Sequence, residues 1–517
     1  MSRLSPKLYT WLVGLFASLG SVLFGYDLGV IAAILPSPDF KLTMGPRIND
    51  RNQEGLVTSL LVLGAFFASP VAGWSGDLIG RRLAIIAGCI TFIVGGVLQT
   101  AAQNIEMMMA GRFFAGAGIG QLAMLVPLYQ SEISQPSIRG SLITLQQFML
   151  GIGAIIATWV GYACVKDAYA EPLAWRLPLG LQLLPCIPLM LCIPLFPESP
   201  RWLAYKGRNE EALQTLARLH ARGDTNDPLV QAEYEEIQIA LREEHSDENT
   251  VKQLFTNKAY FRPLLLGIAL QFSVQMTGVS AIQYYSPQIF ASVGFSTERT
   301  LLFQGFNSII ALAGELACVL FVDKLGRRWP LIISNGMASA TFACGTAIIA
   351  IFPASSDNGS AHIAFIMMTW IYNFFFSAGI GPIAWAYPTE VFPTHLRSTG
   401  VAMTSMSSWI SNFLIAQITP YAFDNIGWRY YLVFCILSAT NAVFFWAFLP
   451  ETKGRPLEEM HIIFRDDSIF VPGSKIAARG KHEAEERFRR GELVTARDSH
   501  KVSDKLGDEK IDRINSA

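Results

Sequence analysis

The sequence predicts an all-α membrane protein in which twelve transmembrane helices form two pseudo-symmetric six-helix halves, with short cytoplasmic helices between them. Three observations support this fold class. Of the 517 residues, 51% are hydrophobic and only 16% are charged, whereas soluble domains carry about a quarter charged residues. Twelve apolar runs are long enough to cross about 30 Å of hydrocarbon. Finally, three short motifs of the first half of the chain recur in the second.

The apolar runs give the helices in chain order. Each must be helical, because lipid offers no hydrogen-bond partner to a backbone amide or carbonyl. Their expected bounds are 9–34, 56–75, 83–103, 107–128, 142–164, 177–196, 262–290, 302–322, 329–351, 362–388, 398–421 and 430–449. The basic start of the chain precedes a first run of spanning length, so we expect this run to be a retained signal anchor rather than a cleaved signal peptide.

Lysine and arginine indicate the orientation. They gather in alternate loops, at Arg81-Arg82, Arg139, 198–261, Arg327-Arg328 and Arg397. Such loops face the cytoplasm, so both termini are expected to be cytoplasmic in a multi-pass protein of the plasma membrane. The one Asn-X-Ser/Thr triplet, which starts at Asn358, then lies in an external loop where glycosylation is possible.

Two charged stretches interrupt this pattern and divide the chain. Residues 198–261 are rich in Glu, Arg, Leu and Ala with helical periodicity, and predict amphipathic cytoplasmic helices. Residues 452–517 form a charged tail that we expect to be largely disordered. The expected domains are therefore a first half at 1–197, a linker at 198–261, a second half at 262–451 and the tail.

Three short charged motifs of the first half recur in the second half. GDLIGRR at 76–82 returns as VDKLGRR at 322–328, SEISQPSIRG at 131–140 as TEVFPTHLRSTG at 389–400, and PESPRW at 197–202 as PETKGR at 450–455. The offsets are 246, 258 and 253 residues. Three echoes at a similar spacing indicate two halves of one design, and parallel six-helix halves with a site between them are the architecture of major facilitator transporters.

These motifs also carry a family resemblance. GDLIGRR, PESPRWL, VPLYQSEISQPSIRGSL, IQYYSP, GPIAWAYPTEVFP and PETKGRPLEEM together resemble the sugar transporter family of the major facilitator superfamily, over about residues 10–465. The linker and tail look most like those of fungal members. The resemblance implies uptake of a monosaccharide or related polyol by alternating access.

Asp27 places a carboxylate inside the first apolar run. A charge at this depth costs at least about 2.5–3.5 kcal/mol, and such residues mark partners or ion pathways. One interpretation is a cap or kink, because Gly25 and Gly29 flank the residue. Another is an ion pair with Arg112 in the fourth run, where the arginine favours the ionised carboxylate and burial the protonated one. The resemblance to plant hexose–proton symporters implies the same pair, with Asp27 accepting the proton and Arg112 releasing it.

Glu315 is a second carboxyl group at membrane depth, in ALAGELACVLF. No basic residue lies at comparable depth in the second half of the sequence. Two interpretations remain open. The side chain can face a central cavity and bind substrate or a proton, or it can lie near a helix end and reach water.

Polar and aromatic side chains in mid-span are candidates for the binding site of a sugar, which needs amides, hydroxyls and a flat aromatic face. Gln271 and Gln275 are four apart on one helix face, and Gly278 permits a bend after them. The tenth run contains two glycines and two prolines, so this helix can unwind. The further candidates are Gln147, Trp385, Ser408, Trp409 and Asn412.

The resemblance sharpens this set. It implies sugar contacts for Gln147, Gln271, Gln275, Trp385 and Asn412, with Tyr284 and Tyr285 closing the external side. The chain departs from the family where many members have two adjacent glutamines at Val274-Gln275 and an asparagine at Ser280. Mammalian glucose carriers have a glutamate at the position of Ser377 and an asparagine at that of Ser408. Since a missing hydrogen bond changes specificity strongly, the substrate can be a hexose, a pentose, a polyol or, less favoured, a sugar acid.

The repeated motifs predict a cytoplasmic salt-bridge latch at the seam of the two halves, which would close the inner gate. Its expected members are Asp77, Arg81, Arg82, Glu132, Arg139 and Glu198 in the first half and Asp323, Arg327, Arg328, Glu390, Arg397 and Glu451 in the second. A lone exposed pair contributes under about 1 kcal/mol, so we expect the network rather than any single pair to bias the conformation.

Other functions find little support in the sequence. There is no nucleotide loop, metal-ligand cluster or nucleophile–base pair, so an enzyme, a cofactor and ATP coupling are not expected, and a net charge of −1 gives no sign of a nucleic-acid partner. The expected partners are a small sugar or polyol, protons and the lipid bilayer. The main hypothesis is a proton–monosaccharide symporter. The alternatives are an uncoupled facilitator, a polyol or sugar-acid transporter, and a non-transporting sugar sensor.

Overall fold

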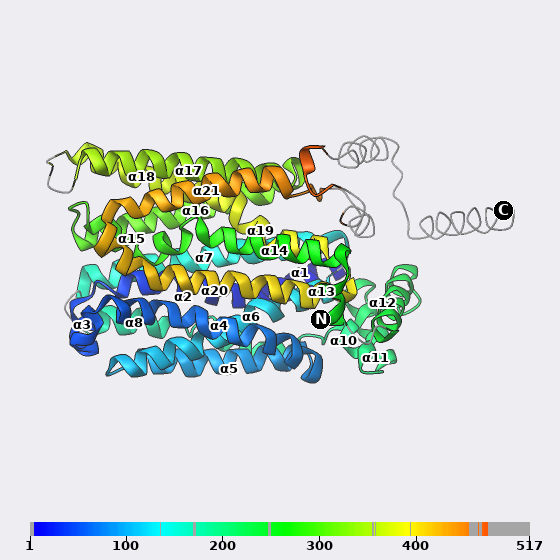
Figure 1. Cartoon of the computed structure of the whole chain (residues 1–517). Helices are drawn as coiled ribbons and strands as arrows, with labels where there is room; N and C mark the ends of the chain where they lie inside the picture. The colour runs from blue at the N-terminus through cyan, green and yellow to red at the C-terminus, as the bar shows by residue number, and fades with distance from the viewer. Residues whose placement is uncertain are drawn as a thin grey trace.

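The apolar runs form long helices that lie side by side and cross the molecule from end to end (Figure 1). The structure is a computed structural model, and it describes residues 5–134, 136–168, 172–246, 250–353, 356, 358–392, 394–453, 464 and 468–473. Every regular element within these ranges is helical. Of the expected tail, all but a few residues lie outside the described ranges.

The first half contains six spans. The first is broken at Ser18 into α1 and α2, and the sixth is broken between α8 and α9. The bounds are α1 Pro6–Ala17, α2 Leu19–Ile34, α3 Pro38–Met44, η1 Pro46–Asn49, α4 Arg51–Ile79, α5 Arg81–Thr100, α6 Ile105–Ile133, α7 Pro136–Ala168, α8 Leu173–Leu181, α9 Cys186–Cys192 and η2 Ile193–Leu195.

The second half repeats this order and begins at Lys258, slightly before the expected residue 262. Its first span is broken between α14 and α15, and its fourth contains a π-helical turn, η3. The bounds are α14 Lys258–Met276, α15 Val279–Ala291, α16 Thr297–Leu325, α17 Arg328–Ile351, α18 Gly359–Phe375, η3 Phe376–Ile380, α19 Gly381–Val391, α20 Thr394–Ile426, η4 Gly427–Arg429 and α21 Tyr430–Phe448.

The number of crossings agrees with the predicted twelve. Eleven helical segments of the described chain are long and apolar enough to span a membrane, and the last of them, Thr399–Phe448, has 50 residues. A helix of that length would measure about 75 Å, more than twice the hydrocarbon thickness. It contains α20 and α21, which are separated by the turn η4, so it accounts for two crossings.

Four short helices connect the halves and lie together at one end of the bundle, beside the start of α1 (Figure 1). They are α10 Pro200–Tyr205, α11 Asn209–His220, α12 Pro228–Ser246 and α13 Thr250–Thr256, as predicted for residues 198–261. His220 joins α11 to the first half, because its Nε2 lies 3.1 Å from the carbonyl oxygen of Ile133. We call this end the linker end and the opposite end, where α3 lies, the far end.

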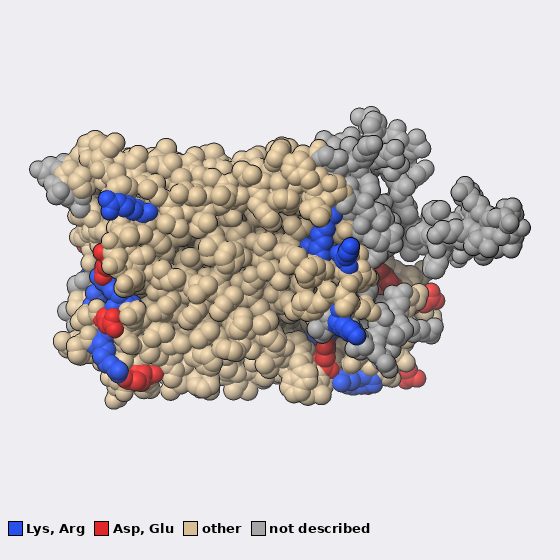
Figure 2. Space-filling view, in the orientation of Figure 1, with Lys and Arg blue, Asp and Glu red and all other residues tan. Residues whose placement is uncertain are grey.

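The surface separates charged from apolar residues along the helix axes. Figure 2 shows Lys, Arg, Asp and Glu at the two ends of the molecule and a broad uncharged band between them on the face in view. Large apolar side chains such as Phe67, Trp74 and Val94 are exposed on the helices of this band. An apolar belt of this kind fits the hydrocarbon of a bilayer, and the protein is a multi-pass membrane protein.

Gly25 and Gly29 do not break the helix around Asp27, which corrects the interpretation of Asp27 as the cap of a helix break. The helix α2 runs without interruption from Leu19 to Ile34, and the span breaks earlier, at Ser18. The glycines instead admit α7, because a Cβ on Gly25 would lie 1.9 Å from the carbonyl oxygen of Leu150. Small residues at such crossings let the backbones of membrane helices approach closely.

Gly278 does provide the predicted bend of the seventh span. It has φ 86° and ψ 10°, in the left-handed region that only glycine adopts readily, and it separates α14 from α15. A Cβ at this position would also lie 2.7 Å from the ring of Phe434 in α21. The bend is therefore fixed both by backbone conformation and by packing.

Candidate functional site

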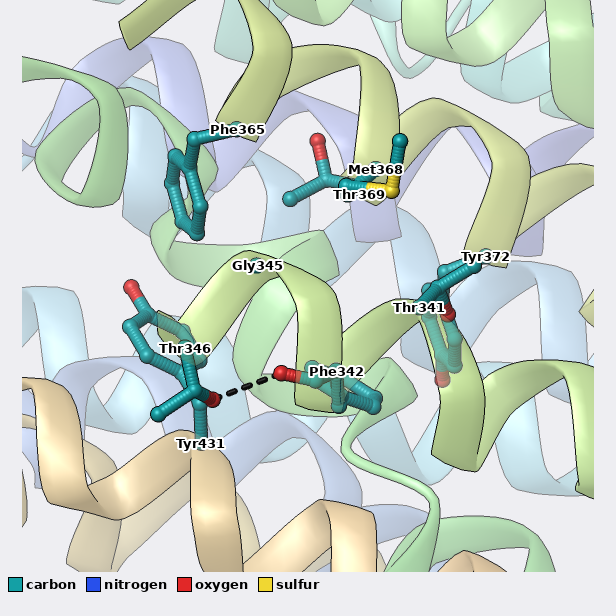
Figure 3. A pocket seen from close by; sticks show the side chains of 9 residues that line it. All are labelled: Thr341, Phe342, Gly345, Thr346, Phe365, Met368, Thr369, Tyr372 and Tyr431. Atoms are coloured by element: carbon teal, nitrogen blue, oxygen red, sulfur yellow. Dashed lines mark hydrogen bonds between the residues drawn. The ribbon is translucent and has the colours of Figure 1, made fainter. Parts of the chain in front are cut away.

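A small apolar pocket lies within the second half, between α17, α18 and α21 (Figure 3). Its volume of about 10 Å³ is the least that one water molecule needs. Its threonine hydroxyls donate to carbonyls of their own helices, as Thr346 does to Phe342 over 2.6 Å. The pocket therefore offers neither space nor free polar groups to a ligand.

The larger cavity has a volume of about 140 Å³ and lies between the two halves. A cavity of about 150 Å³ accommodates a six-membered ring such as benzene. Its wall comes from α2 and α7 of the first half and from α14, α15, α16, α18, η3, α19 and α20 of the second. The sequence places nine residues in the substrate site, counting Ser280 and Ser377, where the chain departs from the family. Eight of the nine line the cavity: Gln147, Gln275, Ser280, Ser377, Trp385, Ser408, Trp409 and Asn412.

Gln271 is the exception among these nine. It is buried, and its Nε2 donates a hydrogen bond of 3.0 Å to the carbonyl oxygen of Ala384 in α19. Gln271 and Gln275 are on one helix face, but Gln271 lies one turn, about 6 Å, nearer the linker end. It therefore packs α14 against α19 instead of facing the cavity.

The polar groups of the cavity wall are arranged by the bend at Gly278. Gln275, on the last turn of α14, donates through Nε2 to the hydroxyl of Ser408 over 3.4 Å. Ser280, on the first turn of α15, donates to Oε1 of the same glutamine. Gln147 approaches from α7 and is half-buried. Its neighbour Gln146 points away from the cavity, where its amide donates to Gln130 of α6.

Aromatic rings form the apolar face of the cavity. Trp385 and Trp409 lie with their ring centroids 6.0 Å apart, and Phe24 of the first half meets Trp409 edge-on at 5.4 Å. The Nε1–H of Trp409 is buried and has no hydrogen-bond partner within the described part of the chain. A ring that presents an apolar face beside a free N–H donor suits a ligand with C–H and hydroxyl surfaces.

Tyr284 and Tyr285, the predicted external gate, lie on α15 and are fully buried, but neither lines the cavity. The hydroxyl of Tyr285 donates to the carbonyl oxygen of Ala416 in α20, over 2.9 Å.

The bonds that join the halves at the far end were not predicted. Arg51 pairs with Asp424 over 2.6 Å, and Gln288 donates to Glu54 over 2.6 Å. Only polar residues near helix ends marked these positions in the sequence.

Asp27 and Arg112 form the expected ion pair. Nη1 of Arg112 lies 2.7 Å from Oδ1 of Asp27, and both side chains are 0% exposed. The guanidinium also donates to the carbonyl oxygens of Val57 and Thr58 in α4, over 3.1 and 3.4 Å. The pair does not line the cavity, but Leu28, the neighbour of Asp27, does. The charges thus lie directly behind the cavity wall, within the first half.

Glu315 lines the cavity, which decides between the two interpretations of its position. It projects from α16 toward α7 and is 8% exposed. Polar residues about two turns away on the same helix, Asn307 and Ser308, also line the cavity and were missed by sequence reasoning. Their signal was the polar pair inside the apolar run GFNSII.

Comparison with known proteins agrees with this geometry. The family model "Sugar (and other) transporter" matches residues 13–464. The chain belongs to this sugar transporter family of the major facilitator superfamily. Its members are transporters, not enzymes.

Individual relatives extend this result. The transporter is 30% identical over 491 residues to the MFS glucose transporter mfs1 of Aspergillus flavus, covering 90% of this chain and 92% of that one. It is 30% identical over 509 residues to a probable quinate permease of Neosartorya fischeri, covering 94% of both. The solved structure of the proton:xylose symporter XylE bound to 6-bromo-6-deoxy-D-glucose matches with a TM-score of 0.76 and 25% identity, over 88% of this chain and 99% of that one.

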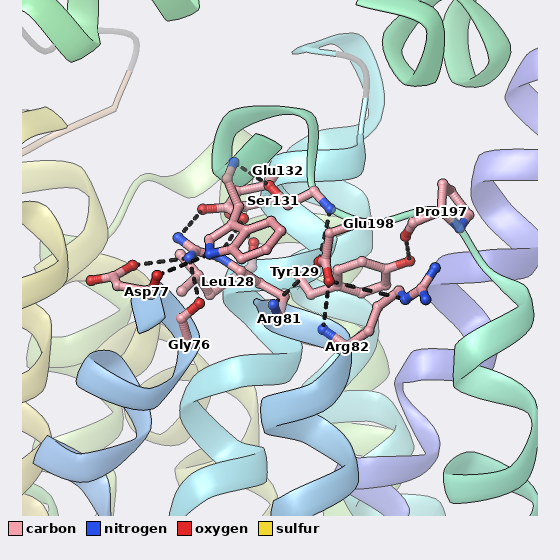
Figure 4. Close-up of polar contacts among 12 residues, drawn as sticks. Gly76, Asp77, Arg81, Arg82, Leu128, Tyr129, Ser131, Glu132, Pro197 and Glu198 are labelled. Carbon is pink, nitrogen blue, oxygen red and sulfur yellow. Dashed lines mark hydrogen bonds and ion pairs between the residues drawn. The ribbon is translucent and has the colours of Figure 1, made fainter. Parts of the chain in front are cut away.

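The transporter carries a charged network at the linker end of its first half (Figure 4). The guanidinium of Arg81 donates two hydrogen bonds of 2.9 Å to Glu132 and one of 2.9 Å to Asp77. Glu198 accepts from the backbone N–H groups of Arg81 and Arg82, over 3.2 and 3.4 Å. The network thereby joins α4, α5 and α6 to the segment that enters the linker.

The second half of the transporter repeats this network. Arg327 approaches Glu390 at 2.8 and 2.9 Å. Glu451 accepts from the backbone N–H groups of Arg327 and Arg328, over 2.8 and 3.1 Å. A tyrosine hydroxyl bonds a proline carbonyl in both halves, from Tyr129 to Pro197 and from Tyr387 to Pro450. The echoed motifs therefore encode one hydrogen-bonding scheme that is used twice.

Within the described side chains, the hydrogen bonds of both networks remain inside their own half. Arg81 and Arg327 each bind a glutamate of their own half, so these two pairs hold helices of one bundle together. Arg397 is half-buried near the start of α20. The side chains of Arg139 and Asp323, also expected in the latch, lie outside the described residues.

Burial raises the pKa of Glu198, while the N–H groups of Ser199 and Arg82 and the charge of Arg82 oppose that shift. The carboxyl group is 13% exposed and lies beyond the end of the sixth span.

Asn358, the possible glycosylation site, is exposed at the far end, and its side chain caps α18 by accepting from the N–H of Ala361 over 3.2 Å.

Proposed function

We propose that this transporter takes up a monosaccharide together with a proton by alternating access. One observation carries the proposal, namely a fully buried Asp27–Arg112 pair behind the wall of a cavity that both halves build. Buried intramembrane charges are costly and mark ion pathways. The cavity offers amides, hydroxyls and two tryptophans, which are the groups that a sugar ring requires.

The proton is proposed to act on the ion pair. While Asp27 is ionised, its carboxylate holds Arg112, and α2 is tied to α6. A proton on the carboxylate removes its charge, so the ion pair is lost and only a hydrogen bond between the cationic guanidinium and a neutral carboxyl group remains. The helix α2, which carries Phe24 and Leu28 into the cavity wall, can then shift against α6. Asp27 is the proton acceptor in this scheme, and Arg112 favours the release of the proton.

The linker end is proposed to face the cytosol of a cell whose plasma membrane holds the protein, with both chain ends on that side. Support comes from the arginines of the repeated motifs, which gather at this end. The far end is closed by bonds between the halves, from Arg51 to Asp424 and from Gln288 to Glu54. The described conformation is therefore proposed to be one in which the external entrance is shut.

The cavity favours a neutral sugar over a sugar acid. One relative is a probable quinate permease, and quinate is an anion. An anionic substrate needs a cation in the wall, but the lining residues of the described chain include a carboxyl group, Glu315, and no lysine or arginine. The relatives that are named glucose transporters agree with a neutral hexose. Polyols and uncoupled transport remain the alternative outcomes of the test below.

Uptake in a yeast strain without hexose carriers of its own tests the proposal. Radiolabelled glucose, xylose, galactose and glycerol are supplied with and without a protonophore. We expect uptake of one of the sugars that falls several-fold with the protonophore, and an Asp27→Asn variant that retains exchange but no longer accumulates sugar. Full activity of Asp27→Asn at every pH would reject the proton role, and failure to move any of the four compounds would reject sugar transport.

A further inference from the structure

One face of α16 lines the central cavity over about three turns. Gln304, Asn307, Ser308 and Glu315 all contribute to the wall, together with Ala311. Their spacing of three or four residues places them on one side of the helix. The stripe ends at Glu315, its residue nearest the linker end. Glu315 is the one acidic residue among the lining residues of the described chain.

Most other polar groups of this stripe are hydrogen-bonded within the protein, whereas Oδ1 of Asn307 is buried without a hydrogen-bond partner among the described residues. Asn307 donates to Gln304 over 3.3 Å, and Ser308 donates to the carbonyl oxygen of Gln304 over 3.1 Å. Thr158 of the first half donates to the hydroxyl of Ser308 over 3.2 Å. These bonds stabilise the wall and engage both hydroxyl groups and the Asn307 N–H at this level of the cavity.

Glu315 differs from these neighbours because it carries a carboxyl group. Its Oε2 is buried and has no hydrogen-bond partner among the described residues, and no lysine or arginine of that part of the chain pairs with it. An unsatisfied buried polar group is costly, more so when it is a carboxyl group, and requires an explanation. A ligand that completes its hydrogen bonds is such an explanation, because the group already faces a cavity large enough for a ring.

The opposite wall is shaped around this carboxyl group. Gly151 of α7 faces Glu315 across the seam of the halves, and a Cβ on Gly151 would lie 2.2 Å from Oε2. The glycine thus leaves room for the carboxyl group next to Gln147, one turn away on α7. A ligand held there would touch α16 of one half and α7 of the other.

We propose that Glu315 contacts the substrate and recognises hydroxyl groups of a neutral sugar ring, together with Gln147 across the seam. The inference rests on the proposed function and adds a specificity-determining residue to it. A carboxyl group has two oxygens and can bind two neighbouring hydroxyl groups at once. A site built to bond a hydroxyl group rejects analogues that lack it, so Glu315 selects for the position of hydroxyl groups on the ring.

Equilibrium binding by the full-length protein in detergent tests this proposal without requiring transport. Trp385 and Trp409 lie in the cavity wall, so their fluorescence reports occupancy. The probes are D-glucose, D-xylose and the monodeoxy derivatives of D-glucose. We expect Glu315→Ala to weaken binding of the preferred sugar by about 10- to 100-fold, the loss of a hydrogen bond to a charged group. One deoxy derivative should bind weakly to the wild type and lose nothing further in the variant.

Two further variants cover the case in which Glu315→Ala does not fold. Glu315→Gln keeps the shape and should lose less affinity, with the same dependence on the deoxy position. Gly151→Ala displaces the carboxyl group without removing it and should reproduce that dependence. Gly336→Ala is the matched control, because a Cβ there meets no atom within 4 Å.

The outcomes separate the inference from the proposed function. If every folded Glu315 variant weakens the parent sugar and all deoxy derivatives by one common factor, or changes none of them, the inference is rejected while sugar binding stands. If the wild type binds no sugar at all, the proposed function and the inference fall together.

Discussion

The two halves of the transporter carry the same motifs and the same hydrogen-bonding scheme, yet they treat their charges differently. In the first half, Arg81 and Glu132 are 8% and 5% exposed, and Asp27 and Arg112 are 0% exposed. In the second half, the counterparts of the first pair, Arg327 and Glu390, are 16% and 27% exposed. The second half also contains the unpaired carboxyl group of Glu315.

Corresponding spans of the two halves also differ in backbone conformation. The first span of each half is broken at a corresponding place. At Ser18 the backbone stays in the right-handed helical region, whereas at Gly278 it is left-handed. The fourth span of each half is also comparable. It is the continuous helix α6 in the first half, but in the second the π-helical turn η3 interrupts it.

This difference assigns the halves different parts in the proposed cycle. The first half pairs its buried charges internally and keeps its fourth span continuous, so it serves as a framework that carries the proposed proton site. The second half supplies most of the cavity wall, and its breaks lie beside lining residues, Gln275 and Ser280 at one and Phe376 and Ser377 at the other. Helix interruptions of this kind are common at functional sites. Sugar recognition and local rearrangement are therefore expected mainly there.

The largest effect is expected from breaking the Asp27–Arg112 pair. Arg112→Leu leaves a buried carboxylate without a partner, and loss of one member of such a pair costs about 3–5 kcal/mol. Thermal unfolding of the purified protein in detergent would show a large decrease in Tm. In the second half, Glu315→Leu should leave the Tm unchanged or raise it, because no partner is stranded.

A double variant provides the control for this prediction. Adding Asp27→Leu to Arg112→Leu should recover most of the lost stability, since apolar replacement of a whole buried pair is often neutral. It should not recover proton-coupled accumulation of sugar. Equal destabilisation by Arg112→Leu and Glu315→Leu would contradict the contrast between the halves.

Next in size is the difference between the two linker-end networks. Glu132→Ala leaves the buried guanidinium of Arg81 with only Asp77 and the carbonyl oxygen of Gly76 as partners and should cost about 3 kcal/mol. Glu390→Ala affects a more exposed pair and should cost about 1 kcal/mol or less. Unfolding of the two variants under the same conditions measures this difference directly.

Transport by the same two variants tests the role of the networks. We expect Glu132→Ala to slow uptake more than it weakens sugar binding, which is how a change in conformational equilibrium differs from a change in the binding site. Parallel loss of rate and affinity would argue against a latch. Equal losses of stability in the two halves would show that burial does not set the strength of the networks.

Gly278→Ala tests the importance of the break in the second half. The left-handed conformation costs a residue with a Cβ about 1–2 kcal/mol, and that atom would meet the ring of Phe434 at 2.7 Å. We expect lower stability and a several-fold loss of sugar affinity, because Gln275 and Ser280 flank the bend. Ser18→Ala at the corresponding break is the matched control and should change binding little. Similar losses in the two variants would remove the distinction.

The pH dependence of stability provides a smaller effect. The pKa of Glu198 is raised in the folded protein by burial, so the folded state holds this proton more tightly than the unfolded chain does. Stability should therefore fall as the pH rises from the ordinary glutamate pKa of about 4.3 to the raised value, where the folded state must give up the proton. Glu198→Gln should flatten the dependence of stability on pH in that window. An unchanged slope would show that another group titrates.

Some of this architecture could be predicted from the sequence, and the reasons are physical. Spans follow from apolar length, and the partner of Asp27 follows from the cost of an unpaired charge in lipid. The orientation of single side chains does not follow as directly. Gln271 shares a helix face with Gln275, but it lies one turn nearer the linker end, where its amide donates to the carbonyl oxygen of Ala384 instead of facing the cavity. The roles of Gly25 and Gly29 depend on which helix packs against them, and the sequence does not show that this helix is α7.

Contacts between distant segments were the hardest to predict. The far-end bond from Arg51 to Asp424 joins residues that are 373 positions apart and half-exposed, and nothing in either local pattern names the other. The linker-end networks were easier to predict, because each motif occurs twice and the two copies support one another. Even so, the repeats did not reveal that their bonds stay within each half, since that depends on the conformation.

The smallest effect concerns two asparagines at the far end, one in each half. Asn104 caps α6 and Asn358 caps α18, through hydrogen bonds of 2.8 and 3.2 Å to backbone N–H groups. Only Asn358 begins an Asn-X-Ser sequence. If the far end is external, the protein from a eukaryotic host should lose mass on treatment with an endoglycosidase. Ser360→Ala should abolish that change and keep the cap, whereas Asn358→Ala should also cost about 1 kcal/mol of stability, as should Asn104→Ala without any change in glycan. A glycan that survives Ser360→Ala would place the modification elsewhere, and an unmodified wild type would count against the proposed orientation.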